Sequence, residues 1–457
     1  MTARKTESAT RLPTDVAAAV NDCLSELESS RFAQRILERD GTLWSGNVEE
    51  SRQRLGWLDV AETMPQLLDS TRSLRSYDED AKISDVVLLG MGGSSLGAEV
   101  LNQVIGRTAG CPRLRLLDST VPGAILAVDR AIDLRHTLFI ASSKSGGTLE
   151  PNLLYQYFRA QVRAEGGNGS QFVAITDPGS SLERLAQADC FRQTFLNPAD
   201  IGGRYSVLSL FGLVPATVLG IDTSSLLGRA AQMAGLCGAE MPLRGNPGVR
   251  LGAFIGGCAR VGRDKLTLLT SPRLSSFGLW AEQLIAESTG KNDRGVVPVT
   301  DEPALPLASY GADRSFIYLR LRGSRNEAMD ALFQRLEQSG FPCLRIDVSD
   351  RYALGSEFYR WEYATAVVGA LLGVNPFDQP DVQRAKDAGN ATLEHVAAFG
   401  TLPAVDDVPD ASALLATLRP SDYFAVTAYI QQQPDTDSIF QDLRRHVSVV
   451  HNVCSTI

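Results

Sequence analysis

Short apolar runs alternate with longer amphipathic stretches from residue 85 onward. Four runs bounded by Gly, Ser and Asp predict buried strands: VVLLG (86–90), LRLLD (114–118), HTLFIAS (136–142) and FVAIT (172–176). Between them, helical spacing of apolar residues predicts helices over 96–105 and 150–165. This order of strands and helices predicts a parallel sheet that is covered by helices on both faces.

The same pattern begins again after a Gly- and Pro-containing stretch at 235–248. Three further runs predict strands: KLTLLTS (265–271), FIYLRL (316–321) and PCLRIDV (342–348). We therefore expect an α/β protein with two parallel-sheet αβα domains, over residues 76–230 and 231–395. Their shared pattern suggests that one architecture was duplicated, although no repeat of individual residues is visible.

The two ends of the chain differ from these units. Residues 1–75 predict an N-terminal helical segment, because Val16, Val20, Leu24 and Leu27 recur at steps of three or four. Trp44 and Trp57 are expected to anchor this segment to the body of the protein. Residues 396–457 predict a C-terminal tail with one strand-like run, YFAVTAYI (423–430), and its abrupt end leads us to expect that the tail is incomplete.

Composition and charge exclude several classes of protein. The 457 residues include 44 basic and 53 acidic side chains, a net charge of −9. This balance argues against binding to nucleic acid or to an anionic membrane, because the overall field repels phosphate groups. Seven scattered cysteines without a C-x-x-C pair, and only four histidines, predict neither structural zinc nor a disulfide framework. Without an apolar leader or a membrane span, we expect a cytoplasmic protein.

A glycine-rich turn follows the first predicted strand. The sequence MGGSSLGAE (91–99) places Gly93 and Ser94 where a strand leads into a helix. Glycines let the backbone approach a ligand, and the amides at a helix start attract an anion. A dinucleotide-binding fingerprint is the alternative, and Asp118 does end the next strand. That reading is weak, because Ser95 takes the place of the third glycine.

A second turn favours a phosphate group over a dinucleotide. Strand 136–142 leads into hydroxyl-, glycine- and lysine-containing residues, of which Ser143, Lys144, Ser145 and Thr148 precede Glu150. Hydroxyls and amides donate hydrogen bonds to a phosphomonoester, and the lysine adds positive charge. Simple capping of the helix is the alternative. Two such loops on successive strands of one parallel sheet favour a ligand, because ligands gather at the carboxyl ends of strands.

Three more segments carry candidate chemistry. In IGGRYS (201–206), Gly203 precedes Arg204, whose ordinary role would be that of a surface charge. In WAEQLIAESTGK (280–291), Gln283 and Glu287 lie four residues apart on one helix face. Glu287 lies near the end of that helix, where the helix dipole favours proton uptake, although a solvated charge is the alternative. The third segment, NPFDQPDV (375–382), contains Gln379 and leads into Lys386.

Five motifs in this order resemble the phosphoglucose isomerase family. They are GMGGSSLG, SSKSGGTLEP, GGRYS, AESTGK and NPFDQPDV-x-x-x-K, within roughly residues 60–390. In its details, the sequence is most similar to the isomerase half of bifunctional transaldolase/phosphoglucose isomerases. The transaldolase half of those proteins has no counterpart here. The resemblance implies two sugar-isomerase (SIS) α/β domains and a homodimer. It also implies no cofactor and no metal.

The resemblance also implies roles for individual residues. Glu287 would be the base that moves a proton between C1 and C2, with Arg204 beside the enediolate and Lys386 serving ring opening. The remaining candidates would bind the phosphate or border the sugar of a hexose 6-phosphate: Gly93, Ser94, Ser143, Lys144, Ser145, Thr148, Glu150, Gly203, Gln283 and Gln379. The expected activity is glucose-6-phosphate isomerase, in glycolysis and gluconeogenesis.

One departure from the family concerns histidine. Family members commonly use a histidine between the glutamate and lysine motifs for ring opening, and none lies between Glu287 and Lys386 here. His395, on the same predicted helix as Lys386, is the nearest replacement, with an ordinary surface histidine as the alternative. Two other functions stay open: a catalytically weakened sugar-phosphate sensor, and an isomerase of another hexose 6-phosphate such as mannose 6-phosphate.

Overall fold

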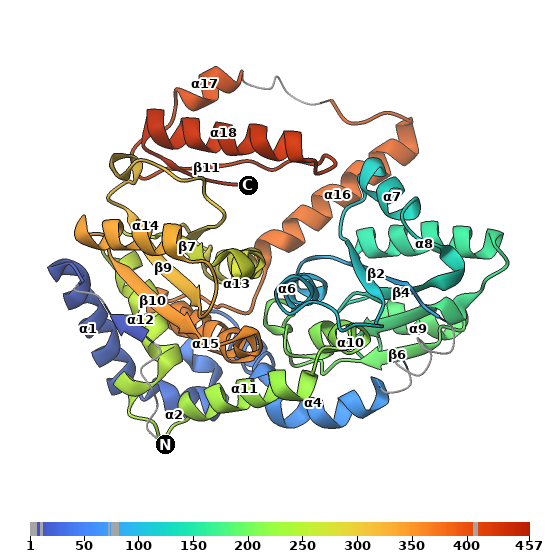
Figure 1. The fold of residues 1–457 in the computed structure, drawn as a ribbon, viewed down its shortest axis with the longest axis horizontal. Helices are drawn as coiled ribbons and strands as arrows, with labels where there is room; N and C mark the ends of the chain where they lie inside the picture. The colour runs from blue at the N-terminus through green and yellow to red at the C-terminus, as the bar shows by residue number, and fades with distance from the viewer. Residues whose placement is uncertain (1–6, 10–11, 72–73, 75–81, 405–409) are drawn as a thin grey trace.

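Two α/β lobes lie side by side, and helices from the N- and C-terminal parts of the chain pack around them (Figure 1). The structure is a computed structural model that describes residues 7–9, 12–71, 74, 82–404 and 410–457. The parts of the predicted end segments that fall on 1–6, 10–11, 72–73, 75 and 405–409 lie outside the described residues.

The first lobe is built on a five-stranded parallel sheet in the order β3-β2-β4-β5-β6. Its strands are β2 (Asp85–Gly90), β3 (Arg113–Leu117), β4 (Thr137–Ser142), β5 (Phe172–Thr176) and β6 (Gln193–Leu196). All four predicted strands are confirmed. Strand β6 was not predicted, because it is a short edge strand in which only Phe195 is buried and no continuous apolar run marks it.

Helices cover both faces of this sheet, as the alternation of strands and helices predicted. On one face, Val87, Leu89 and Phe139 pack against three helices, α7 (Pro122–Asp129), α8 (Leu149–Ala164) and α9 (Ser181–Ala188). On the other face, Val86 and Leu88 join a core that includes α6 (Leu96–Val104) and α10 (Leu210–Val218). The predicted helices 96–105 and 150–165 are therefore confirmed.

The second lobe contains a sheet in the order β1-β10-β9-β7-β8. Its strands are β1 (Glu7–Ala9), β7 (Lys265–Thr270), β8 (Val297–Val299), β9 (Arg314–Leu321) and β10 (Cys343–Val348). All pairs are parallel except β1 with β10. The order β8-β7-β9-β10 repeats the order β3-β2-β4-β5 of the first lobe, so the two units share one topology, as expected.

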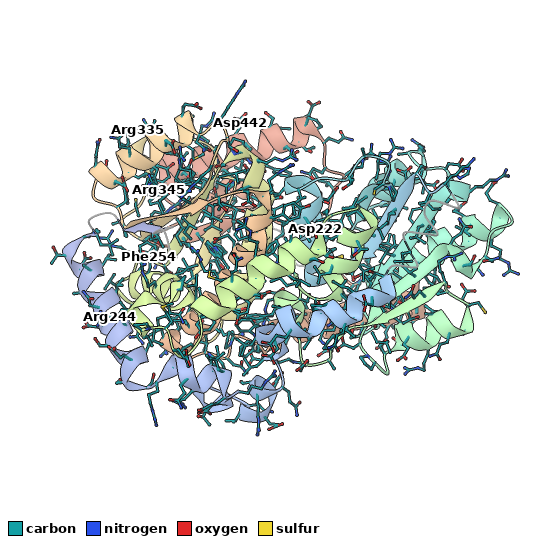
Figure 2. The ribbon with its side chains drawn as sticks, turned by 60° about the horizontal axis from the view of Figure 1, so that its bottom comes forward. Asp222, Arg244, Phe254, Arg335, Arg345 and Asp442 are labelled. Carbon is teal, nitrogen blue, oxygen red and sulfur yellow. The ribbon has the colours of Figure 1, made fainter. Side chains whose placement is uncertain are left out.

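Helix α15 (Leu354–Leu372) of the second lobe is buried along almost its whole length. The lobe also contains α11 (Thr223–Leu236), α12 (Pro247–Arg260), α13 (Ser275–Thr289) and α14 (Glu327–Gln338). Side chains of α12, α13 and α15 share one core with Leu266 and Ile317 of the sheet. Helix α11 starts after its capping residue Asp222, which is labelled near the middle of the molecule in Figure 2, and it lies below α15 of the second lobe in Figure 1.

The N-terminal segment is mainly helical, as predicted, apart from strand β1 at its start, and it is anchored to the body. Its helices are α1 (Thr14–Ser29), α2 (Phe32–Leu37), α3 (Val48–Arg52) and α4 (Val60–Leu68). The indole of Trp44 donates a hydrogen bond to the carbonyl of Ala366 at 2.8 Å, and Trp57 is fully buried. Both tryptophans therefore tie the segment to the core around α15.

The C-terminal tail is more exposed. It contains α16 (Pro380–Phe399), α17 (Ala411–Leu415), β11 (Tyr423–Ala425), α18 (Pro434–His451) and β12 (Cys454–Thr456). The strand predicted over 423–430 is wrong beyond Ala425, because its pairing partner β12 has only three residues and Tyr429 is left 89% exposed. Helix α16 crosses between the lobes in Figure 1. Among the described helices, none is long and apolar enough to cross a membrane.

Candidate active site

The two predicted anion-binding loops meet at one edge of the first sheet. Strands β2 and β4 are neighbours, with Gly90 opposite Ser142, while β3 and β5 lie on opposite outer sides of this pair. The loops after β2 and β4 therefore leave the sheet at a point where the strand order reverses, which is where open α/β sheets bind ligands. The hydroxyl of Ser142 donates to the carbonyl of Ser94 at 2.7 Å and joins the loops directly.

The loop after β4 presents hydroxyl groups at the start of α8. The hydroxyl of Ser143 donates to Thr148 Oγ1 at 3.2 Å, and the amide of Gly147 donates to Ser145 Oγ at 3.2 Å. Ser143 is buried, Ser145 is exposed, and Thr148 and Glu150 are half-buried. Because α8 begins at Leu149, its first amides point to the same place as these hydroxyls. The loop thus offers neutral donors to an anion.

Lys144 is engaged differently from its neighbours. Its ammonium forms an ion pair with Asp177 and donates to the carbonyl of Ala199 at 3.1 Å. Burial lowers the pKa of Lys144, and the contact with Asp177 opposes that shift. The positive charge that the sequence offered to a phosphate is already compensated by a neighbouring carboxylate.

Glycines bring the first lobe against the catalytic candidates. A Cβ atom at Gly93 would lie 2.0 Å from the carbonyl oxygen of Gly203, so only glycine fits where the two turns touch. Gly92 adopts φ +53°, and a Cβ atom there would lie 2.5 Å from Nε2 of Gln283. The hydroxyl of Ser206 donates to the carbonyl of Gly93 at 3.1 Å. These contacts join the turn after β2, the Gly203 segment and α13.

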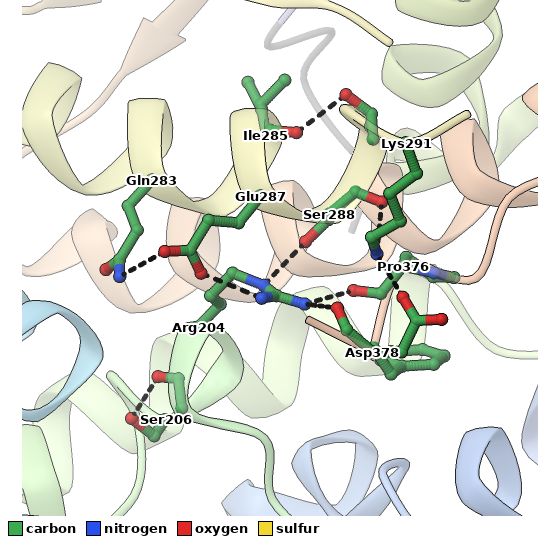
Figure 3. Close-up of polar contacts among 12 residues, drawn as sticks. Arg204, Ser206, Gln283, Ile285, Glu287, Ser288, Lys291, Pro376 and Asp378 are labelled. Carbon is green, nitrogen blue, oxygen red and sulfur yellow. Dashed lines mark hydrogen bonds and ion pairs between the residues drawn. The ribbon is translucent and has the colours of Figure 1, made fainter. Parts of the chain in front are cut away.

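Arg204 lies at the centre of a network of polar contacts (Figure 3). Its Nη1 donates to Glu287 Oε2 at 2.9 Å, and its Nε donates to Ser288 Oγ at 3.1 Å. Its Nη2 donates to the carbonyls of Pro376 at 2.9 Å and Asp378 at 3.0 Å. The Arg204 side chain is only 4% exposed, whereas that of Glu287 is 32% exposed. The arginine is therefore fixed in the interior, and the carboxylate remains accessible.

Gln283 completes the surroundings of the carboxylate. Its Nε2 donates to Glu287 Oε1 at 3.3 Å, one helical turn earlier on α13. Each carboxylate oxygen of Glu287 thus accepts one hydrogen bond from a different element. Such contacts fix the orientation of a group that can accept a proton from a ligand.

Two charged residues belong to this network although the sequence pointed to no role for them. Lys291 forms an ion pair with Asp378 Oδ1 at 2.7 Å, and it also donates to the carbonyls of Asn375 and Ser288. Burial lowers the pKa of Lys291, while the contact with Asp378 opposes the shift. Lys291 ends the motif AESTGK, and Asp378 lies within the motif NPFDQPDV. Their place in these motifs was the only feature of the sequence that could have pointed to a role for them.

Three expected residues are not brought into the network. Gln379 is exposed at the start of α16, and Lys386 is exposed in the second turn of that helix. Lys386 makes no hydrogen bond or ion pair with a residue that the structure describes. His395 is half-exposed, and its ring lies 4.7 Å from that of Phe399 on the same helix. Within the described ranges, no group of three or more His, Cys, Asp or Glu side chains could hold a metal ion.

The sequence is similar to one protein family and to individual glucose-6-phosphate isomerases. The model of the family described as phosphoglucose isomerase matches residues 57–297. A glucose-6-phosphate isomerase from Parasynechococcus marenigrum is 30% identical over 349 residues, which are 68% of this chain and 63% of that protein. One from Methanocaldococcus jannaschii is 27% identical over 360 residues, 70% of this chain and 85% of that protein.

A solved structure shows the shared fold. A glucose-6-phosphate isomerase from Chlamydia trachomatis superposes with a TM-score of 0.64 at 19% identity and covers 90% of each chain. The expected fold class, an α/β protein with SIS-type parallel sheets, is confirmed. The family match covers more than half of the sequence and contains the glycine turns, Arg204 and Glu287. The chain therefore belongs to the phosphoglucose isomerase family of aldose–ketose isomerases.

Proposed function

We propose that this protein interconverts glucose 6-phosphate and fructose 6-phosphate through a cis-enediolate. The observation that carries the proposal is the contact between Gly93 and Gly203. Through this contact, uncharged hydroxyl and amide groups that can donate hydrogen bonds to a phosphate lie beside the accessible carboxylate of Glu287, which is paired with the buried guanidinium of Arg204. Aldose–ketose isomerisation needs such an anchor for the phosphate, and a proton acceptor at the reacting carbons.

The phosphate group would be held by the loops after β2 and β4. Gly93 and Ser94 from the first loop, and Ser143, Ser145 and Thr148 from the second, would supply hydroxyl and amide donors. Lys144 would contribute mainly through its backbone, because Asp177 engages its ammonium. Binding the phosphate far from the reacting carbons fixes the sugar and leaves C1 and C2 free to react.

Glu287 would then move one proton. Its carboxylate takes the proton from C2 of the open-chain aldose, the electron pair forms the C1–C2 double bond, and the carbonyl oxygen becomes the enediolate oxygen. Glu287 returns the proton to C1, while the proton of the O2 hydroxyl moves to the enediolate oxygen O1, so that C2 becomes the ketone and C1 carries the hydroxyl. Gln283 would hold the carboxylate and border the sugar.

Arg204 would stabilise the enediolate with one remaining N–H. A guanidinium has five N–H groups. Nε uses one on Ser288, Nη2 uses two on backbone carbonyls, and Nη1 uses one on Glu287. The fifth, also on Nη1, has no partner among the described residues and is adjacent to the carboxylate. A fixed donor beside developing negative charge is an efficient way to lower a barrier.

Ring opening and the sides of the sugar are assigned by resemblance. Lys386 would serve ring opening, with Glu150, Gln379 and Gly203 lining the sugar. Since α16 leaves Lys386 exposed, this step needs the helix or its surroundings to approach the substrate. We also propose a homodimer in the cytoplasm, as is typical of the family.

A coupled assay without added metal tests the function. Glucose 6-phosphate and fructose 6-phosphate are expected to interconvert, and mannose 6-phosphate to react more slowly. Turnover of mannose 6-phosphate alone would identify another hexose phosphate isomerase. Binding of glucose 6-phosphate by calorimetry with no turnover would identify a sensor.

A further inference from the structure

We propose that Lys291 and Asp378 form a positioning pair, which holds Arg204 in the orientation that the reaction needs. The inference rests on the proposed function and deepens it. Neither residue touches the face where Gln283 and Glu287 meet the glycine turn, so the pair would act through Arg204. Figure 3 shows the pair on the opposite side of the guanidinium from Gln283.

The first step of the argument is that Arg204 depends on a loop outside its own lobe. Its Nη2 has two acceptors, and both are backbone carbonyls of the loop between α15 and α16. A carbonyl can fix a guanidinium only if the backbone that carries it is itself fixed. The position of the Pro376–Asp378 segment therefore sets the plane of the guanidinium.

The second step is that Lys291 ties this loop to the end of α13. Its ammonium contacts the Asn375 carbonyl at the start of the loop and the Asp378 carboxylate at its end. It also contacts the Ser288 carbonyl, and Ser288 itself accepts from Arg204 Nε. One buried cation thus contacts Ser288, the residue after Glu287, and both Asn375 and Asp378 of the loop. Lys291 is only 7% exposed, so water screens these contacts little.

The third step is that apolar packing holds the middle of the loop but leaves its charged end to the ion pair. The ring of Phe377 lies 4.9 Å from that of Trp44 and 5.2 Å from that of Tyr205. Asp378 is the last loop residue before the exposed Gln379, and its side-chain ion pair is with Lys291. Without that pair, the Asp378 carbonyl is the acceptor of Arg204 that we expect to shift first.

The test compares two single variants with their combination. Lys291→Met keeps most of the side-chain length and removes the charge, and Asp378→Asn keeps the shape and removes the negative charge. Each is expected to lower kcat by about 10- to 100-fold, because small displacements of a reacting group cost up to about 10²-fold. KM is expected to stay within about threefold, because the phosphate loops belong to the other lobe. The double variant is expected to match the worse single variant, since both remove one interaction.

An isotope effect separates positioning from a loss of folded protein. With glucose 6-phosphate deuterated at C2, a misplaced Arg204 makes proton transfer more rate-limiting, so the isotope effect on kcat is expected to rise in both variants. Partial unfolding would lower the active fraction and leave the isotope effect unchanged. Calorimetric titration with glucitol 6-phosphate, which has no carbonyl and cannot react, gives the active fraction independently.

Lys265→Met is the matched control. Lys265 is also a buried lysine, 4% exposed, and pairs with Asp264 at 2.9 Å. It begins β7, whereas ligands gather at the carboxyl ends of such strands. This variant is expected to lose stability but to keep kcat and the isotope effect.

The outcomes are distinct from failure of the proposed function. A wild-type protein without hexose 6-phosphate isomerase activity overturns the function itself. An active wild type, with unchanged kcat and isotope effect in folded Lys291→Met or Asp378→Asn, overturns the positioning pair. If Lys291→Met does not fold, Asp378→Asn alone decides by the same two measurements.

Discussion

The two lobes contribute to the candidate site in different ways. The first lobe supplies loops whose donors are short and neutral, and Ser145 is exposed beside the buried Ser143. The second lobe supplies α13, where Glu287 joins a network of charges with the buried Arg204. The loops after β2 and β4 have unused donors. The network has almost none, because four of the five N–H groups of Arg204, which itself comes from the first lobe, are already used.

This difference separates binding from chemistry. Neutral hydroxyls and amides are well hydrated without a ligand, so the loop tolerates the absence of its anion at little cost. A buried guanidinium is different, because leaving its charge without hydrogen-bond partners costs several kcal/mol, so its partners must be present with or without substrate. We therefore expect changes in the loops after β2 and β4 to act mainly on KM, and changes in the network, including Arg204, to act mainly on kcat.

Glu287→Gln is expected to have the largest effect. The amide keeps the shape but cannot accept a proton, so kcat should fall by about 10²–10⁴-fold, the usual contribution of one positioned base. Binding of glucitol 6-phosphate should change little. Glu282→Gln, on the same helix, is the control: its carboxylate accepts from Thr300 and Thr456, and burial raises its pKa. Unreduced turnover in Glu287→Gln would place the base elsewhere.

Arg204→Lys is expected to come next. An ammonium cannot hold Glu287, Ser288 and two carbonyls in one plane, and the donor to the enediolate is lost. We expect kcat to fall by about 10²–10³-fold, as for the loss of one preorganised oxyanion donor. Arg229→Lys provides a control, because Arg229, which lies on α11 away from the network, pairs with Asp350. Steady-state rates close to those of the wild type would show that Arg204 does not stabilise the enediolate.

Ser145→Ala and Thr148→Ala sharpen the comparison from the other lobe. Each removes one donor to a charged group, worth about 1.5–3 kcal/mol, so KM should rise by roughly 10- to 100-fold. Free glucose should remain a poor substrate of both variants and of the wild type. The comparison between lobes fails if phosphorylated and unphosphorylated sugars lose reactivity equally.

His395→Ala is expected to have the smallest effect. The ring contacts Phe399 of its own helix and has no link to Arg204 or Glu287, so the rate on cyclic glucose 6-phosphate should stay within about twofold. Lys386→Met, from the same helix, should slow the cyclic sugar by about 10²-fold, the lower range for one acid–base group. Stopped-flow assays of cyclic and pre-opened substrate measure both. Selective slowing by His395→Ala would instead assign ring opening to that histidine.

Much of the fold was predictable from local patterns. Continuous apolar runs such as VVLLG identify strands that are buried on both faces, since the core requires such runs. Short edge strands such as β6 and the end of the 423–430 run could not be assigned, because pairing decides their extent and the partner lies far away in sequence.

The sequence by itself determined the two α/β units, the glycine turns, and the motifs that contain Ser143, Arg204 and Glu287. Motif spacing is local, so it identifies these groups without their surroundings. Only the tertiary structure decided that Asp177 takes the charge of Lys144, that Lys291 and Asp378 join the network, and that Lys386 stands apart on α16. The physical reason is that charge pairing, burial and the direction of a helix depend on which distant segments meet. A linear pattern contains no information on those contacts until the chain has folded.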